Sequence, residues 1–220
     1  MDGYEVRPIT KGPAWNSGLE QEIWQTAQVA ELRHHMGQRP DHFPHVEARL
    51  LYDPAALYVW FQIDDAYVRA VAPEHQAAVY KDSCVEFFFT PSEDVSSGYF
   101  NLEMNCGGTM LFHIQRVPRQ GQLIGADHVN AVDVAHTLPR IVEPELVGPV
   151  RWSVQYRLPF DILGHYHPAV VAPHSGVHWR ANFYKCADAC SHPHWLTWAP
   201  VNHPKPDFHR PDSFGLLVFA

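Results

Sequence analysis

The clearest pattern in the chain is a pair of neighbouring segments in which apolar and polar side chains alternate. Residues 84–90 and 99–105 both show it, and a polar segment, residues 91–98, connects them. A period of two residues is typical of β-strands. Two such strands joined by a polar turn predict an antiparallel hairpin.

The side chains also predict the register of this hairpin. If Val85, Phe87 and Phe89 lie over Phe100, Leu102 and Met104, then Glu86, Asn101 and Glu103 share the opposite face. A slip of one residue would send these polar groups into the core. Asp82 is expected on the same side as Glu86. The polar face has two interpretations: a solvated outer surface or a polar binding surface.

Further segments with the same alternation predict an all-β protein. The expected strands cover residues 27–32, 46–52, 57–63, 109–116, 129–137, 151–158, 178–185 and 214–219, and short helical turns are expected in residues 19–25, 74–79 and 159–164. No βαβ rhythm is visible. We therefore expect one domain, residues 1–220, folded as an antiparallel β-sandwich of the jelly-roll or immunoglobulin-like kind, with a few short helical turns.

Composition and charge narrow the classes of partner. The chain has 220 residues, is 46% hydrophobic and carries a net charge of −8 with only 16 Lys and Arg. That balance disfavours nucleic acid as a partner.

No apolar run is long enough for a membrane span. No signal peptide is visible at the start, which favours a cytoplasmic location unless a signal has been removed. Nothing in the pattern predicts an oligomeric state.

Landmarks along almost the whole chain resemble carbohydrate-binding module family 9. They are Ile23-Trp24, Leu50 to Asp53, Leu57 to Val59, Asp64-Asp65, Lys81 to Phe87, Tyr99 to Glu103, Asn105, Gly107, Leu158 to Phe160, Asn182 to Cys186 and Phe208 to Gly215. Their order and spacing make the resemblance specific. It implies a β-sandwich that binds the ends of plant-type polysaccharides such as xylan or glucan, often beside a xylanase.

The resemblance also implies roles for particular residues. It puts Glu86 and Asn101 at positions that hydrogen-bond a sugar, with Asn182 nearby. The two aromatics that clamp a sugar ring in the family fall near Tyr80 and Phe208, where this chain has no Trp. Family members can also hold calcium, which would concern Asp64, Asp65 or Asp82.

The side-chain chemistry agrees with sugar binding. Aromatic faces cover the C–H surface of a sugar ring, and carboxylate, amide and guanidinium groups hold paired hydroxyls. The candidates that supply these groups are Tyr80, Glu86, Asn101, Glu103, Arg180, Asn182, Trp195, Trp198, Phe208, His209 and Arg210. For the two tryptophans, burial in the core is an equally good interpretation.

Two other functions stay open. Glu86 and Glu103 on adjacent strands could be the acid/base pair of a glycoside hydrolase, since retaining enzymes hold two carboxyl groups about 5 Å apart. Alternatively, the aromatic and Pro-rich segment 191–212 could grip a protein partner, because long ordered loops are usually functional. If the chain binds sugar, the end of this segment, Phe208 to Arg210, is expected to wall the pocket of Glu86 and Tyr80.

Two candidate metal sites follow from ligand types alone. Cys186, Cys190, His192 and His194 offer the sulfur and nitrogen donors that zinc prefers, although free thiols and loop histidines are the simpler interpretation. Asp64 and Asp65, with Asp82, offer oxygen donors for calcium. Adjacent aspartates are also typical of a turn that ends a strand.

Overall fold

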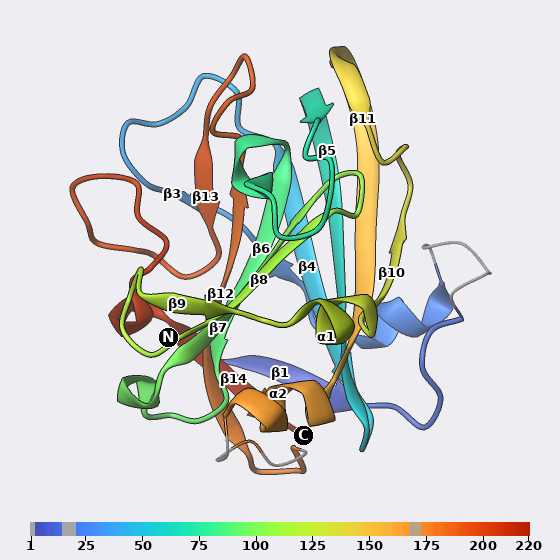
Figure 1. Cartoon of the computed structure of the whole chain (residues 1–220), viewed down its shortest axis with the longest axis vertical. Helices are drawn as coiled ribbons and strands as arrows, with labels where there is room; N and C mark the ends of the chain where they lie inside the picture. The colour runs from blue at the N-terminus through green and yellow to red at the C-terminus, as the bar shows by residue number, and fades with distance from the viewer. Residues whose placement is uncertain (1–2, 15–20, 168–169, 171–172) are drawn as a thin grey trace.

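The computed structural model describes residues 3–14, 21–167, 170 and 173–220, and in it the strands form one curled sheet that folds over on itself (Figure 1). Its strands are β1 (Tyr4–Pro8), β2 (Ala30–Glu31), β3 (His34–His35), β4 (His45–Tyr52), β5 (Ala56–Ala70), β6 (Cys84–Thr90), β7 (Tyr99–Asn105), β8 (Met110–Gln115), β9 (Gly121–Leu123), β10 (Asp133–His136), β11 (Val142–Pro159), β12 (His178–Cys186), β13 (Trp195–Thr197) and β14 (Gly215–Phe219). Short 3-10 helices η1 (Glu22–Thr26), η2 (Val79–Lys81), η3 (Val95–Ser97) and η4 (Pro211–Ser213) and α-helices α1 (Ala126–Asn130) and α2 (Phe160–Tyr166) complete the fold.

The sheet has the layered, sandwich-like form that the alternation predicted, but it is mixed. Its strand order is β10-β11-β5-β4-β1-β14-β12-β6-β7-β8-β9. In Figure 1, β10, β11 and β5 lie to the right, and β12, β13 and β3 lie to the left. Strand β1 connects the β4 side of the sheet to the β14 side. Its residues Tyr4 to Val6 pair with β14 and its residues Arg7 to Pro8 pair with β4, both in parallel. The expectation of a strictly antiparallel sheet is corrected at these two pairings.

The register of the central hairpin is confirmed. Val85 pairs with Met104, Phe87 with Leu102 and Glu86 with Glu103. The apolar set lies in the main core between the layers, where Phe87 stacks on Phe183 of β12 with ring centroids 5.1 Å apart. The polar set shares the opposite face, as the alternation requires.

That opposite face is not a solvated surface. Glu86 is 2% exposed and Asn101 is 1% exposed. A second hydrophobic cluster, which includes Phe88, Tyr184 and Phe208, covers part of this face. Strands β6, β7 and β12 are therefore buried on both faces, and the polar groups between the two clusters lie in a largely dehydrated environment.

Several local expectations were wrong. Strand β5 does not end at Asp64-Asp65 but continues to Ala70, because its second half pairs with the first half of β11, residues 142–150, across two irregularities. Helix α1 was not expected, since five residues are too few for a helical period. The helical turn expected over residues 19–25 is found as η1, except that residues 19–20 lie outside the described part of the chain.

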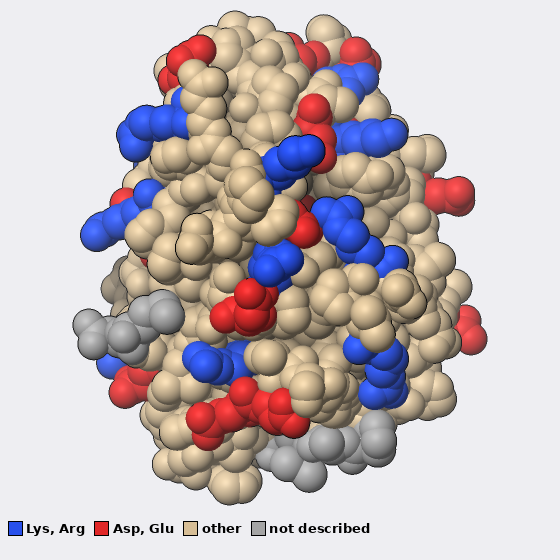
Figure 2. All heavy atoms as spheres, turned by 90° about the vertical axis from the view of Figure 1, so that its left-hand side faces the viewer, with Lys and Arg blue, Asp and Glu red and all other residues tan. Residues whose placement is uncertain are grey.

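The visible surface carries charges of both signs (Figure 2), as the numbers of acidic and basic residues in the sequence suggest. Figure 2 shows the face at the left of Figure 1, where Lys and Arg atoms are interspersed with Asp and Glu atoms. Among the described residues, no helix combines the length and apolar character needed to cross a bilayer.

We expect Phe87→Ala to lower the free energy of unfolding by about 3–5 kcal/mol, since it removes a buried ring and leaves a cavity. Val147→Ala, at a side chain that is 75% exposed, should cost less than about 1 kcal/mol. Urea unfolding of both variants checks the core. A Phe87→Ala variant as stable as the Val147→Ala control would contradict the register.

Candidate functional site

The polar face of the central hairpin forms the floor of a cavity of about 440 Å³. Strands β6, β7 and β8 provide this floor. The walls come from the segments that follow β12 and precede β14, around residues 186–195 and 206–209. Residues far apart in the sequence therefore converge because the strand order places β12 beside β6.

A chain of hydrogen bonds connects the polar side chains of the floor. The amide of Gln115 donates to Asn101 Oδ1 at 3.0 Å, and the amide of Asn101 donates to Glu103 Oε1 at 3.0 Å. Two buried oxygens, Glu103 Oε2 and Gln115 Oε1, have no hydrogen-bond partner among the described residues. Buried polar atoms are normally paired, so these two oxygens leave hydrogen-bonding capacity unused in residues that line the cavity.

Glu86 completes the floor beside Glu103. It accepts a hydrogen bond from Cys186 Sγ at 3.1 Å. Burial, with Cys186 and Glu103 close by, raises the pKa of Glu86 well above its ordinary value. Burial also raises the pKa of Glu103, to about 8. Burial therefore favours the protonated carboxylic acid in both groups, and a carboxylic acid can donate as well as accept a hydrogen bond.

Aromatic side chains form much of the apolar surface of the cavity. Phe208 packs face to face on Tyr184, with ring centroids 4.1 Å apart, and is only 8% exposed. Tyr80, 37% exposed, lies at the cavity with half-buried Trp195, whose indole N–H donates to Asp188 Oδ1 at 2.8 Å. Phe88 contributes an apolar part of the floor. The cavity thus combines flat apolar faces with polar groups that are fixed by their neighbours.

His209 is held in the wall by Tyr99. Its Nδ1 lies 2.7 Å from the Tyr99 hydroxyl. Burial, with the charge of Arg119 nearby, lowers the pKa of His209 to about 4. Arg119 itself forms an ion pair with Asp207 at 2.7 Å.

The structure does not bring every candidate to the cavity. Tyr80, Glu86, Asn101, Glu103, Phe208 and His209 line it, whereas Arg180, Asn182 and Arg210 do not. Asn182 is used structurally, because its amide donates to Ala199 O at 3.0 Å and its Oδ1 accepts from Ala199 N. Arg180 donates to Phe214 O, and Arg210 forms an ion pair with Asp212.

Two residues of the floor were missed, although a signal for them existed. His113 and Gln115 belong to the polar side of β8, and His113 is the direct partner of Asn101 across the sheet. Extending the hairpin register by one strand would have placed both on the face of Glu86.

The aspartates proposed for calcium do not meet. Asp64 forms a bidentate pair with Arg151, at 2.6 and 2.9 Å. Asp65 is buried between His42, at 2.6 Å, and Lys185, at 3.7 Å. Asp82 accepts from Asn105 Nδ2 at 2.8 Å. Each carboxylate already has a separate partner, which corrects the expectation of a shared calcium site.

The four residues proposed for zinc are also separated. Cys190 Sγ lies 3.8 Å from Ser83 Oγ, and His194 Nε2 lies 2.8 Å from Lys185 Nζ. His192 stacks on Tyr67 with ring centroids 3.5 Å apart. Only Cys186 faces the cavity. The close spacing of these residues in the sequence does not gather their donor atoms, so this expectation is corrected too.

A curled β-sandwich with a concave, polar and aromatic pocket on one sheet face defines a class of ligand-binding modules. The chain belongs to carbohydrate-binding family 9, because the model of that family matches residues 19–219. The family resemblance seen in the sequence is thereby confirmed. No curated protein matches the chain.

Solved structures share the fold. A Bacteroides uniformis protein, to which carbohydrate binding has been assigned provisionally, is 26% identical, with a TM-score of 0.87 and 99% of each chain covered. A family 9 module from Caldicellulosiruptor kristjanssonii in complex with cellotriose is 14% identical, with a TM-score of 0.66 over 99% of this chain and 93% of that one. A glucose complex from the same organism is 13% identical, with a TM-score of 0.64 over 98% and 95%.

The depressed pKa of His209 predicts a pH dependence of stability. Because the folded-state pKa lies below the ordinary value of 6.5, this residue stabilises the fold above pH 6.5. The contribution is lost as the pH falls toward 4, up to a limit on the order of 3 kcal/mol.

Urea unfolding between pH 7 and pH 4 checks this expectation. The His209→Asn variant should lose less stability over that range than the parent, and His174→Asn, at an exposed histidine, should behave like the parent. Equal losses in the parent and His209→Asn would show that His209 is not held neutral by burial.

Proposed function

We propose that this protein binds carbohydrate without cleaving it, as a single domain, and that the cavity above Glu86 and Glu103 takes the end of a glucan or xylan chain. One observation carries the proposal. Glu103 and Gln115, each with one buried oxygen that has no partner among the described residues, line the same cavity as the exposed side chain of Tyr80. Sugar rings present hydroxyls at their edges and C–H groups on their faces, so they complement both features.

The protonation of the floor suits a neutral ligand. A carboxylic acid can donate to one sugar hydroxyl and accept from another, as an amide does. The floor therefore offers donor and acceptor groups in alternation: Gln115, Asn101, Glu103 and Glu86. Because each is fixed by its neighbours, little side-chain entropy remains to be lost on binding.

The size of the cavity and the relatives support a small saccharide. A volume of about 440 Å³ falls within the range of about 300–1,000 Å³ that is typical of small-molecule sites. The solved family 9 modules that share this fold were obtained with cellotriose and with glucose. These ligands favour a glucan end over xylan, and they favour a saccharide over the protein partner that segment 191–212 suggested.

The same pKa shifts disfavour the hydrolase alternative. A retaining glycosidase needs one ionised carboxylate as nucleophile beside a protonated acid. Here both Glu86 and Glu103 have raised pKa values, with burial as the largest cause. The raised pKa values therefore disfavour the ionised nucleophile that this mechanism needs.

We expect Tyr80→Ala to weaken cellotriose binding by about 1–3 kcal/mol, which is about 5- to 150-fold, because one aromatic anchor is lost. Isothermal titration calorimetry measures this loss. Tyr80 is partly exposed, so thermal melting should change little. Ile141→Ala, at an exposed apolar residue outside the cavity, is the matched control. Unchanged cellotriose binding by Tyr80→Ala would place the sugar elsewhere.

Glu86→Gln and Glu103→Gln test for catalysis. Glutamine keeps the size of each side chain but removes its acid and base functions. We expect the parent to show no turnover of aryl glucosides, aryl xylosides or xylo-oligosaccharides over days, as followed by chromatography. Turnover that is present in the parent and lost in both variants would establish the enzyme instead.

A further inference from the structure

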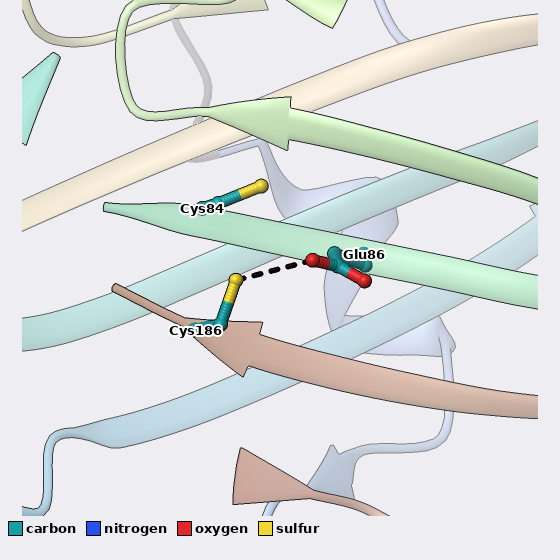
Figure 3. Close-up of side chains that lie close together, drawn as sticks. All are labelled: Cys84, Glu86 and Cys186. Carbon is teal, nitrogen blue, oxygen red and sulfur yellow. Dashed lines mark hydrogen bonds between the residues drawn. The ribbon is translucent and has the colours of Figure 1, made fainter. Parts of the chain in front are cut away.

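A second cluster of reactive side chains lies at the end of the cavity floor. Cys84 on β6 is the direct partner of Cys186 on β12, and Glu86 follows two residues after Cys84 on the same face. One ligand atom from each of the three lies within 4.8 Å of the other two. Figure 3 shows the Cys186 sulfur directed at the Glu86 carboxyl group, with the Cys84 sulfur close by.

This cluster shares Cys186 with the zinc site that the sequence suggested, but Cys84 and Glu86 belonged to neither suggested metal site. Within residues 3–14, 21–167, 170 and 173–220, no other group of three or more His, Cys, Asp or Glu residues brings its donor atoms this close. All three side chains are buried, with exposed fractions of 0% for Cys84, 1% for Cys186 and 2% for Glu86. The two cysteines are free thiols.

We propose that Cys84, Cys186 and Glu86 form a binding site for a thiophilic divalent cation of the zinc type. Two sulfur donors and one carboxylate oxygen suit zinc and its spectroscopic substitutes cobalt and cadmium. They do not suit calcium, which takes oxygen ligands. The Cys186 Sγ to Glu86 Oε1 distance of 3.1 Å shows that two of the donors are already close enough to share one ion.

A cation at this point would lie among acidic side chains, because Asp188 and Glu103 line the same cavity as Cys186 and Glu86. A divalent ion would replace two S–H bonds and one O–H bond with bonds to the metal, and the three protons would pass to water.

The neighbouring basic side chain is engaged by other groups. Lys185 lies next to Cys186 in β12, and its ammonium group donates to the backbone oxygen of Cys186 at 3.0 Å and contacts His194 Nε2, at 2.8 Å, and Asp65 Oδ2, at 3.7 Å. Alternate residues of a strand point to opposite faces, so Lys185 belongs to the core side of the sheet and Cys186 to the cavity side.

The cavity gives the ion access from solvent and leaves space for a fourth ligand. Cys186 and Glu86 both line the cavity, while Cys84, which belongs with Cys186 to the second hydrophobic cluster, does not line it. Three protein ligands leave a four-coordinate ion one position for water or another small ligand. That position would face the cavity. This inference does not rest on sugar binding, because only the three protein donors define the site.

Cadmium and cobalt titrations of the reduced protein test the site. Thiolate coordination produces sulfur-to-metal charge-transfer absorption, which histidine ligands on the surface do not produce. We expect a charge-transfer band that saturates at one ion per chain. Cys84→Ser and Cys186→Ser should each weaken binding by about tenfold or more, and Glu86→Gln should weaken it in the same direction. Calcium should neither produce the band nor compete for it.

Cys106→Ser and Cys190→Ser are the matched controls, since both cysteines are buried and free but lie outside the cluster. They should keep the band. Thermal melting gives a second readout: zinc should raise the melting temperature of the parent and of the controls, but not that of Cys84→Ser or Cys186→Ser. No charge-transfer band in the parent, or an unchanged band in Cys84→Ser and Cys186→Ser, would overturn the proposal.

Discussion

The dominant constraint on this structure is that its central strands are buried on both faces. One face of β6, β7 and β12 packs in the main core, and the other lies beneath the segments that follow β12. Polar side chains on the second face therefore cannot rely on bulk water and must find partners within the protein. The bonds from Gln115 to Asn101 and from Asn101 to Glu103 are the result.

The site follows from the places where this pairing is incomplete. One oxygen of Glu103 and one of Gln115 have no partner among the described residues, and burial raises the pKa of both Glu86 and Glu103. The same conditions account for the protonated thiols of Cys84 and Cys186 next to Glu86. A neutral saccharide and a thiophilic cation would thus use neighbouring parts of one floor. Each would supply interactions to polar groups that have lost contact with water.

The sequence predicted what depends on alternation and missed what depends on the path of the loops. The period of two was enough for the hairpin register and for the cavity positions of Glu86, Asn101 and Glu103. The family resemblance placed Asn182 near the sugar, but the backbone of Ala199 takes up its amide through two hydrogen bonds. Likewise, spacing along the chain suggested Cys190 as a partner for Cys186, whereas the neighbouring strand supplies Cys84.

Nuclear magnetic resonance of side-chain amides tests the central claim most directly, namely that a saccharide end is held on the polar floor. During a titration with cellotriose, the side-chain N–H signals of Asn101 and Gln115 should shift and saturate together. The signal of Asn182, buried outside the cavity, should stay in place. Saturable shifts elsewhere in the protein, with Asn101 and Gln115 unmoved, would contradict the account.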